Sequence, residues 1–242
     1  MLNISGKIKG VLGKGNFWTI KEVEADAPIA IEGENYKNVA CKFSNRKNRA
    51  DIGNNLRIYH SIKKAGLPTL HFLEYGLFKH EECLVAENFN NRPNTLYVSP
   101  NTPTENPNPI LLALSNRPNN YIPSINEKFL SDHKIEELVK FEEFLNLLKR
   151  IVYVATLGKV GLCPDALFFG VSKRSYNQLT DCIIADFDAI MIINDDDDDF
   201  DDLFKRNLDE VLTALKEFAW KFIAENKRQK YLDDISSWSN GK

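Results

Sequence analysis

Apolar and polar positions alternate through much of the first 90 residues, which is the pattern of half-buried β-strands. The runs at 7–12 and 17–23 flank a glycine-containing turn, so they are expected to form a hairpin. The run at 36–43 predicts a third strand, and those at 70–77 and 83–87 predict two more. The first part of the chain is therefore expected to form an antiparallel sheet.

One helix is expected within this strand-rich part. Leu56, Tyr59 and Ile62 recur at helical spacing inside residues 49–64. The glycine and proline at 65–68 end that pattern. The predicted order is five strands, with a single helix between the third and the fourth.

Residues 88–123 break the pattern, because they contain seven of the ten prolines and many asparagines. Proline lacks the backbone donor that helices and sheets require, so no regular element is expected here. We predict a long irregular insertion over 91–124, with one helical turn at 110–114. Either this insertion is a flexible linker, or apolar stretches such as 96–98 pack against the rest of the protein.

The remainder of the chain is expected to be mainly helical. Ser131 is a candidate N-cap for a long amphipathic helix that ends near Gly158. The runs at 167–172 and 178–185 predict a strand pair, and 189–193 predicts a further short strand. A final helix, followed by a short tail, has the clearest periodicity, with an apolar face formed by Phe204, Leu208, Val211, Leu215, Phe218 and Phe222.

The composition is that of an ordinary folded protein. The 242 residues, 43% apolar and 27% charged, suffice for one large or two small cores. A net charge of −3 argues against broad binding to nucleic acid or membrane surfaces, which requires a basic face. No run reaches the ~20 apolar residues of a membrane span. Four widely spaced cysteines are expected as reduced, buried thiols of a cytoplasmic protein, or of one delivered into a host cell by a dedicated secretion system.

The acidity is concentrated at 195–202, where seven aspartates surround Phe200. One interpretation is a solvated loop that places negative charge at the N-terminus of the last helix, where such charge is favourable. The other is a docking patch for a basic partner, or a divalent-cation site. The run lacks the glycine and the ligand spacing of an EF-hand loop.

Three short motifs follow one another in a particular order. Gly13 and Gly15 lie in the hairpin turn, the sequence V-A-C-K ends at Lys42, and the sequence D-F-D begins at Asp186. In this order they resemble the glycine loop, the strand lysine and the D-F-G motif of the protein kinases. The resemblance covers nearly the whole chain.

This resemblance implies an α+β, two-lobed protein kinase-like fold. The N-lobe would comprise residues 1–90, an antiparallel sheet of five strands plus one helix. The C-lobe would comprise residues 91–242, reduced and mainly helical, and would include the Pro/Asn-rich insertion at 91–124. In size the chain is similar to the small kinase-like effectors of bacterial pathogens.

The resemblance also implies a site for ATP and Mg²⁺. Backbone N–H groups of Gly13 and Gly15 would approach the phosphates. Lys42 would pair with the α- and β-phosphates, and Asp186 would hold Mg²⁺, which prefers oxygen ligands.

The adenine would occupy the other end of the same site. Ile20 would pack on the base, and Ala40 is assigned to the nucleotide site with it. Glu87 and Asn88 lie at the hinge of such a fold, where backbone groups would bind adenine.

The sequence departs from the family where catalysis is performed. Gly161 stands at the position of the base aspartate, and Ala166 stands at that of the second metal ligand. Glycine cannot accept a proton and alanine cannot bind a metal. Asp165 lies next to the empty metal position, so it is either a substitute catalytic and Mg²⁺-binding residue or a surface carboxylate.

Two further positions also depart from the family pattern. The glutamate that pairs with the strand lysine is missing, and Asn55 is its best match, with Asp51 one turn earlier as a possible substitute. Trp18 replaces the third glycine of the turn.

Three functions are compatible with these residues. The first, which we favour, is a pseudokinase that binds ATP and Mg²⁺ and acts mainly through a protein partner. The second is an active but atypical kinase that uses Asp165 or Asp188 as metal ligand or base, with a protein or small-molecule acceptor. The third is an α+β interaction module that binds no nucleotide.

Overall fold

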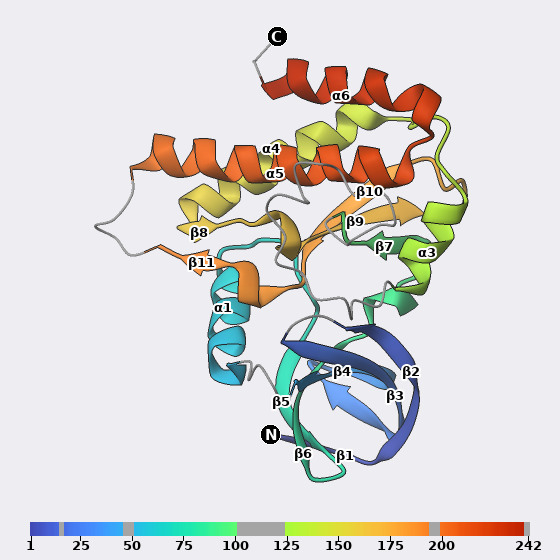
Figure 1. Cartoon of the computed structure of the whole chain (residues 1–242). Helices are drawn as coiled ribbons and strands as arrows, with labels where there is room; N and C mark the ends of the chain where they lie inside the picture. Colours follow the sequence, from blue (N-terminus) through green and yellow to red (C-terminus); the bar gives the residue numbers. More distant parts are fainter. Residues whose placement is uncertain (15–16, 46–50, 101–123, 194–198, 240–242) are drawn as a thin grey trace.

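A computed structural model describes most of the chain. The described ranges are 1–14, 17–45, 51–100, 124–193 and 199–239. Their architecture is α+β, as expected, with a curled sheet at one end of the molecule and a group of helices at the other (Figure 1). Gly15 and the helical turn expected at 110–114 lie outside these ranges, as do 195–198 of the acidic run.

The curled sheet contains six strands within the described residues, in the order β1-β5-β6-β4-β3-β2. The strands are β1 (Leu2–Ile4), β2 (Gly6–Lys14), β3 (Trp18–Ile31), β4 (Glu34–Ser44), β5 (Leu73–Phe78) and β6 (Glu81–Glu87). The five expected strands are confirmed, but the count of five and the purely antiparallel sheet are wrong. The additional strand β1 pairs in parallel with β5, and its three residues are too few to show a period.

The sheet curls because β1 and β2 are parts of one continuous segment that reaches both of its edges. The backbone N–H of Asp26 in β3 donates to the carbonyl of Ser5, between the two strands, at 2.9 Å. Gly6 pairs with Ala25 beside this bend. A Cβ on Gly6 would lie 2.3 Å from the carbonyl oxygen of Glu24, so only glycine permits this approach.

Helix α1 (Ile52–Lys64) connects β4 to the strands that follow it, and it confirms the expected helix. Asp51 caps it by accepting from the backbone N–H of Asn54 at 2.9 Å. The chain leaves the helix through Gly66, whose φ of +77° favours glycine. Tyr59 and neighbouring apolar residues of α1 are buried against the rest of the protein.

Regular structure continues past residue 88, which the proline content did not predict. A short 3-10 helix, η1 (Phe89–Asn91), is followed by β7 (Thr95–Val98). Strand β7 pairs with β9 (Leu167–Ser172), and β9 pairs with β10 (Leu179–Ile184). The residues of β7 fit between two prolines, and Leu96, Tyr97 and Val98 are buried, which confirms that this stretch packs against the protein.

The long helix expected from Ser131 to Gly158 is two helices. α3 (Ile125–Asp132) begins at Ser124, so Ser131 lies in its last turn and is not an N-cap. α4 (Phe141–Leu157) begins after Lys140, which has a φ of +57°, and it ends at Gly158 as expected. Ile135 lies between the two helices and forms a β-bridge to Ile223. It is buried although it is not helical, so an apolar residue at this position has the same spacing as one on a helical face.

The final part also contains one helix more than expected. α5 (Phe200–Phe222) confirms the strongest helical pattern, but α6 (Glu225–Ser239) replaces the short tail. Few side chains of α6 are buried, and Tyr231 and Ile235 are the main ones. The apolar period of this helix is therefore weak. The strand expected at 189–193 is β11 (Met191–Ile192), which pairs with β8 (Val160–Gly161). None of the helices described has both the length and the apolar character needed to cross a membrane.

Candidate functional site

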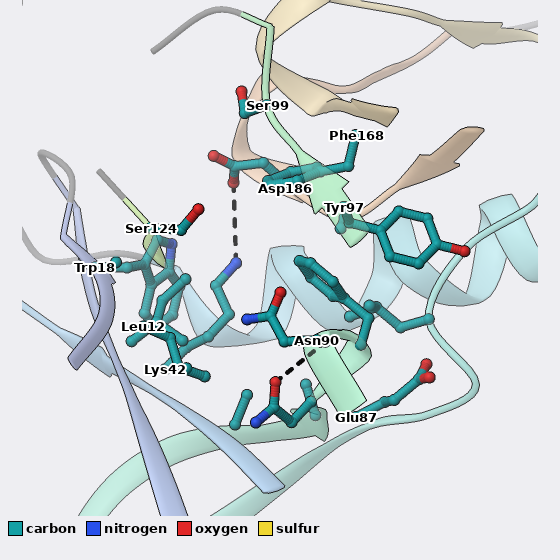
Figure 2. Close-up of a pocket in the computed structure, with 18 of the residues that line it drawn as sticks. Leu12, Trp18, Lys42, Glu87, Asn90, Tyr97, Ser99, Ser124, Phe168 and Asp186 are labelled. Atoms are coloured by element: carbon teal, nitrogen blue, oxygen red, sulfur yellow. Dashed lines mark hydrogen bonds and ion pairs between the residues drawn. The ribbon is translucent and has the colours of Figure 1, made fainter. Parts of the chain in front are cut away.

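A cavity of about 340 Å³ lies between the curled sheet and the segments that follow it in the chain (Figure 2). Residues from every predicted motif meet at this cavity. The predicted site residues that line it are Gly13, Ile20, Ala40, Lys42, Glu87, Asn88, Asp165 and Asp186. The ninth, Gly15, lies outside the described residues.

Lys42 and Asp186 face each other across the cavity (Figure 2). Lys42 lies on β4, which pairs with β3 on one side and β6 on the other, so its position is fixed by the sheet. Asp186 directly follows β10 and Ala185, whose backbone N–H donates to the Ala166 carbonyl at 3.0 Å. The Lys42 Nζ is 3.8 Å from Asp186 Oδ1. The expected convergence of these two residues is therefore present.

The ammonium of Lys42 is otherwise surrounded by aromatic rings. It lies 5.1 Å from the centroid of the Trp18 ring and 5.8 Å from that of Phe187. Both distances are within the range of cation–π attraction. The Lys42 side chain is only 5% exposed, so Asp186 and these two rings replace much of the water that would solvate its charge.

Asp186 is in an environment that disfavours its negative charge. Burial raises the pKa of this carboxyl, and the nearby carboxylates of Asp188 and Asp165 raise it further, while Lys42 acts in the opposite direction. Its Oδ1 is covered and has no hydrogen-bond partner. A cation bound here would therefore meet a carboxylate oxygen that accepts no hydrogen bond and whose ion-pair partner, Lys42, is 3.8 Å away.

The residues present fit a Mg²⁺ ion held by two carboxylates. Asp165 and Asp186 line the same cavity, and Mg²⁺ in nucleotide sites commonly takes one or two carboxylates together with phosphate oxygens and water. The described residues contain no group of three or more His, Cys, Asp or Glu side chains arranged to hold a metal.

The segment before Asp165 is held by a buried asparagine that the sequence did not single out. Asn207 of α5 accepts from the backbone N–H of Leu162 at 2.8 Å and donates to the Val160 carbonyl at 3.0 Å. It fixes β8 and the short η2 helix (Pro164–Ala166) that presents Asp165. The signal in the sequence was that Asn207, a polar residue, falls on the apolar face of the helix that became α5.

Asp188 joins three distant segments of the chain, which was not expected. One carboxylate oxygen accepts from the indole N–H of Trp18, and the other accepts from the Asn55 amide at 2.6 Å. Asn55, the best match to the missing glutamate, is therefore bound to Asp188. Asp51 is not a substitute, because its carboxylate caps α1.

Part of the cavity lining is apolar. Leu12, Ile20 and Ala40 line it from the sheet, and Phe168 of β9 lines it from the opposite part of the chain. Apolar walls of this kind fit a planar ring. Ala86 and Glu87, at the end of β6, line the same cavity.

The carboxylate of Glu87 is occupied by the protein. Arg92 donates to its two oxygens at 2.6 and 2.8 Å, and the backbone N–H of His71 donates at 2.9 Å. Burial alone would raise the pKa of Glu87, but these donors outweigh it and the pKa is lowered. Glu87 lies away from Lys42 in the cavity, so its contribution to a ligand is its backbone (Figure 2).

The side chain of Asn88 is also occupied by the protein. It donates to Glu22 at 3.1 Å and accepts from the backbone N–H of Asn90 at 3.3 Å, which caps η1. Like Glu87, it presents mainly its backbone to the cavity.

Arg92 ties this end of the cavity to the second sheet. Beyond Glu87, it donates to the hydroxyl of Tyr97 at 3.0 Å, and that hydroxyl donates to Asp181. The three residues come from η1's C-cap, β7 and β10. Sequence reasoning missed this network because Arg92 and Tyr97 fall in the segment expected to be irregular.

A polar rim completes the cavity. Glu127 of α3 is buried and accepts from the backbone N–H groups of Ser99 and Ser124, at 3.1 and 2.8 Å. The spacing S-x-x-E from Ser124 to Glu127 is a capping-box signature that the sequence contained.

No known protein-family model matches the chain, and no curated protein matches it either.

Proposed function

We propose that this chain is a compact pseudokinase. Residues 1–90 would be the N-lobe of a kinase-like fold, and residues 91–242 a reduced C-lobe. ATP with Mg²⁺ would bind in the cavity between them, and the protein would act mainly through a protein partner. The observation that carries this proposal is the 3.8 Å approach of Lys42 Nζ to Asp186 Oδ1 inside the cavity.

Each predicted group has a place in this proposal. The purine would lie between the apolar residues of the sheet and Phe168, beside the backbone that follows β6. Lys42 would place a positive charge against the phosphates. Asp186 and Asp165 would hold Mg²⁺, which would neutralise phosphate charge when bound.

By the resemblance, Gly161 stands where the family has its general base, and no acid stands at Ala166. Asp188 has hydrogen bonds on both oxygens, from Trp18 and Asn55. Loss of a general base lowers a rate by about 10²- to 10⁴-fold, so we expect binding without efficient transfer.

The alternative is an active, atypical kinase. It is supported by Asp165, which lines the cavity together with Asp186. In this case Asp165 would accept the proton or bind the metal, and the acceptor would be a protein or a small molecule.

Thermal unfolding with ATP, with and without Mg²⁺, tests the proposal. A ligand at 100 times its Kd stabilises the folded state by about 2.7 kcal/mol. We expect this shift in the parent protein and in the surface control Lys37→Ala, and its loss in Lys42→Ala and Asp186→Ala. No shift in the parent would favour the interaction module without nucleotide.

Incubation with labelled ATP then separates the two nucleotide-binding functions. The pseudokinase predicts no transfer to the protein or to a cell lysate. Transfer that is abolished by Asp165→Ala would instead establish the atypical kinase.

A further inference from the structure

Trp18 lies at the polar end of the cavity, next to the lysine that would meet the phosphates. Its side chain is 5% exposed and lines the cavity. The Lys42 ammonium is 5.1 Å from its ring centroid, and its indole N–H donates to Asp188. Asp188 is in turn bound by Asn55 at 2.6 Å. We call the group formed by Trp18, Asp188 and Asn55 the tryptophan contact.

A phosphate oxygen that pairs with Lys42 must come within about 3 Å of the ammonium. Such a phosphate competes with the neighbours that now face this charge. Phe187 is fully buried and packs edge-on against Tyr59 of α1, with the ring centroids 5.7 Å apart. Asp186 is the expected metal ligand. Trp18 is the remaining neighbour.

The contact that holds Trp18 is accessible to water. Asp188, which accepts from the indole, is an exposed residue, so solvent can compete for its carboxylate. The backbone of Trp18 is fixed separately, because Trp18 pairs with Ser44 and the neighbouring Phe17 carbonyl accepts from Asn45 at 2.7 Å. Release of the ring therefore requires a rotation of the side chain and leaves the strand in place.

We propose that the tryptophan contact is autoinhibitory: it keeps Trp18 over Lys42 and weakens the binding of a nucleoside triphosphate, but not of a nucleoside. This inference rests on the proposed nucleotide site. It assigns a role to Asp188 and Asn55, which bond to each other and not to Lys42. A partner protein or a modification that releases Asp188 would then raise the affinity for ATP.

The test compares Kd values for ATP with Mg²⁺ and for adenosine, measured by calorimetry. Trp18→Phe keeps an aromatic ring and every charge, but it removes the indole donor and makes the side chain smaller. We expect it to tighten ATP binding about tenfold, which is about 1.4 kcal/mol, with adenosine affinity changed less than twofold. Trp220→Phe, the same substitution at an exposed tryptophan, is the matched control and should change neither value.

Asp188→Ala releases the contact from its other side and should tighten ATP binding at least as much, because it also removes a negative charge from the site. Where this variant does not fold, Trp18→Phe and the following spectroscopic measurement decide.

Fluorescence reports Trp18 directly. The chain has three tryptophans, so Trp220→Phe with Trp238→Phe leaves Trp18 as the single emitter. We expect ATP with Mg²⁺ to shift its emission to longer wavelength, as the ring moves into water, and adenosine to leave the emission unchanged.

The outcomes distinguish this inference from the function on which it rests. If both ligands bind but Trp18→Phe leaves the ATP-to-adenosine ratio unchanged, the autoinhibitory contact is overturned and the nucleotide site stands. If neither ligand binds to the parent or to any variant, both proposals are overturned. An equal emission shift with both ligands also overturns the contact.

Discussion

The amide of Asn55 donates a 2.6 Å hydrogen bond to Asp188 Oδ1, which ties α1 to the segment after β10. Lys42 is left facing Asp186 and two aromatic rings. The carboxylate of Asp188 therefore holds α1 in place, whereas the ammonium of Lys42 is the charge that would meet a phosphate. This separation allows each one to be changed independently.

Asp186 predicts a distinctive dependence of stability on pH. Its pKa is raised above the ordinary value of 3.8, chiefly by burial, so the folded protein holds this proton more tightly than the unfolded chain does. Relative to Asp186→Asn, the parent should lose stability as the pH rises from below 3.8 through the raised value, and should then change no further. Urea denaturation of both proteins between pH 4 and 7 measures the difference.

A difference between the parent and Asp186→Asn that stays constant, or that grows in favour of the parent as the pH rises, would contradict the assignment of a disfavoured charge at Asp186.

The buried pair of Glu87 and Arg92 should contribute strongly to stability. Removing one partner of such a pair leaves a buried charge alone, so Glu87→Gln is expected to cost about 3 kcal/mol of unfolding free energy. The same substitution at Glu24, whose pairs with Lys9 and Lys37 are at the surface, should cost much less. Urea unfolding at pH 7 measures both.

This pair also predicts a loss of stability in acid. The pKa of Glu87 is lowered below its ordinary value of 4.5, because the donors from Arg92 and His71 outweigh burial. Its contribution should be complete above pH 4.5 and should disappear as the pH falls through the lowered value.

Equal costs for the two glutamate substitutions would show that the Arg92 network is not important for stability.

Gly161 offers a direct test of the missing base. A Cβ at this position would lie 3.4 Å from Met191 Cβ and 3.5 Å from Arg206 Nη2, which are ordinary contacts, so a Cβ is tolerated there. We expect Gly161→Asp to transfer labelled phosphate from ATP at least about tenfold faster than Gly161→Asn, which has the same size but is not a base. Equal rates for the two variants would mean that the absence of a base does not limit this site.

Cys163 should be the first thiol to react, because it is partly exposed and Cys41, Cys83 and Cys182 are buried. Burial raises its pKa to about 11, so only a small fraction is thiolate at neutral pH. Alkylation by iodoacetamide should therefore accelerate about tenfold per pH unit between pH 7 and 9. Mass spectrometry locates the label, and Cys163→Ser should remove the fastest phase. A pH-independent rate would contradict the raised pKa.

Local patterns in the sequence predicted most of the regular elements. Strands such as β9 and helices such as α5 have a strong period and clear ends, so their existence could be read directly. Lys42 and Asp186 were placed together because their motifs occur in a fixed order. These predictions depend on residues that are close in the sequence, or on motifs whose order can be read along the sequence.

The remaining features depend on contacts that sequence patterns do not encode. Trp18 and Asp188 are 170 positions apart, and no local signal links an indole to that carboxylate. Ile135 was assigned to a helix because burial in a connecting segment produced the same spacing as a helical face. Strand β1 was missed because its pairing partner, β5, is distant along the chain.

The parallel pairing of β1 with β5 has a consequence for how the protein avoids self-association. An unpaired strand edge is a template on which another chain can add. Residues 2–4 cover such an edge on β5, yet they are held there by only a three-residue register. The edge strand on this side is thus only three residues long, and removal of residues 2–4 would expose the longer edge of β5 to neighbouring molecules.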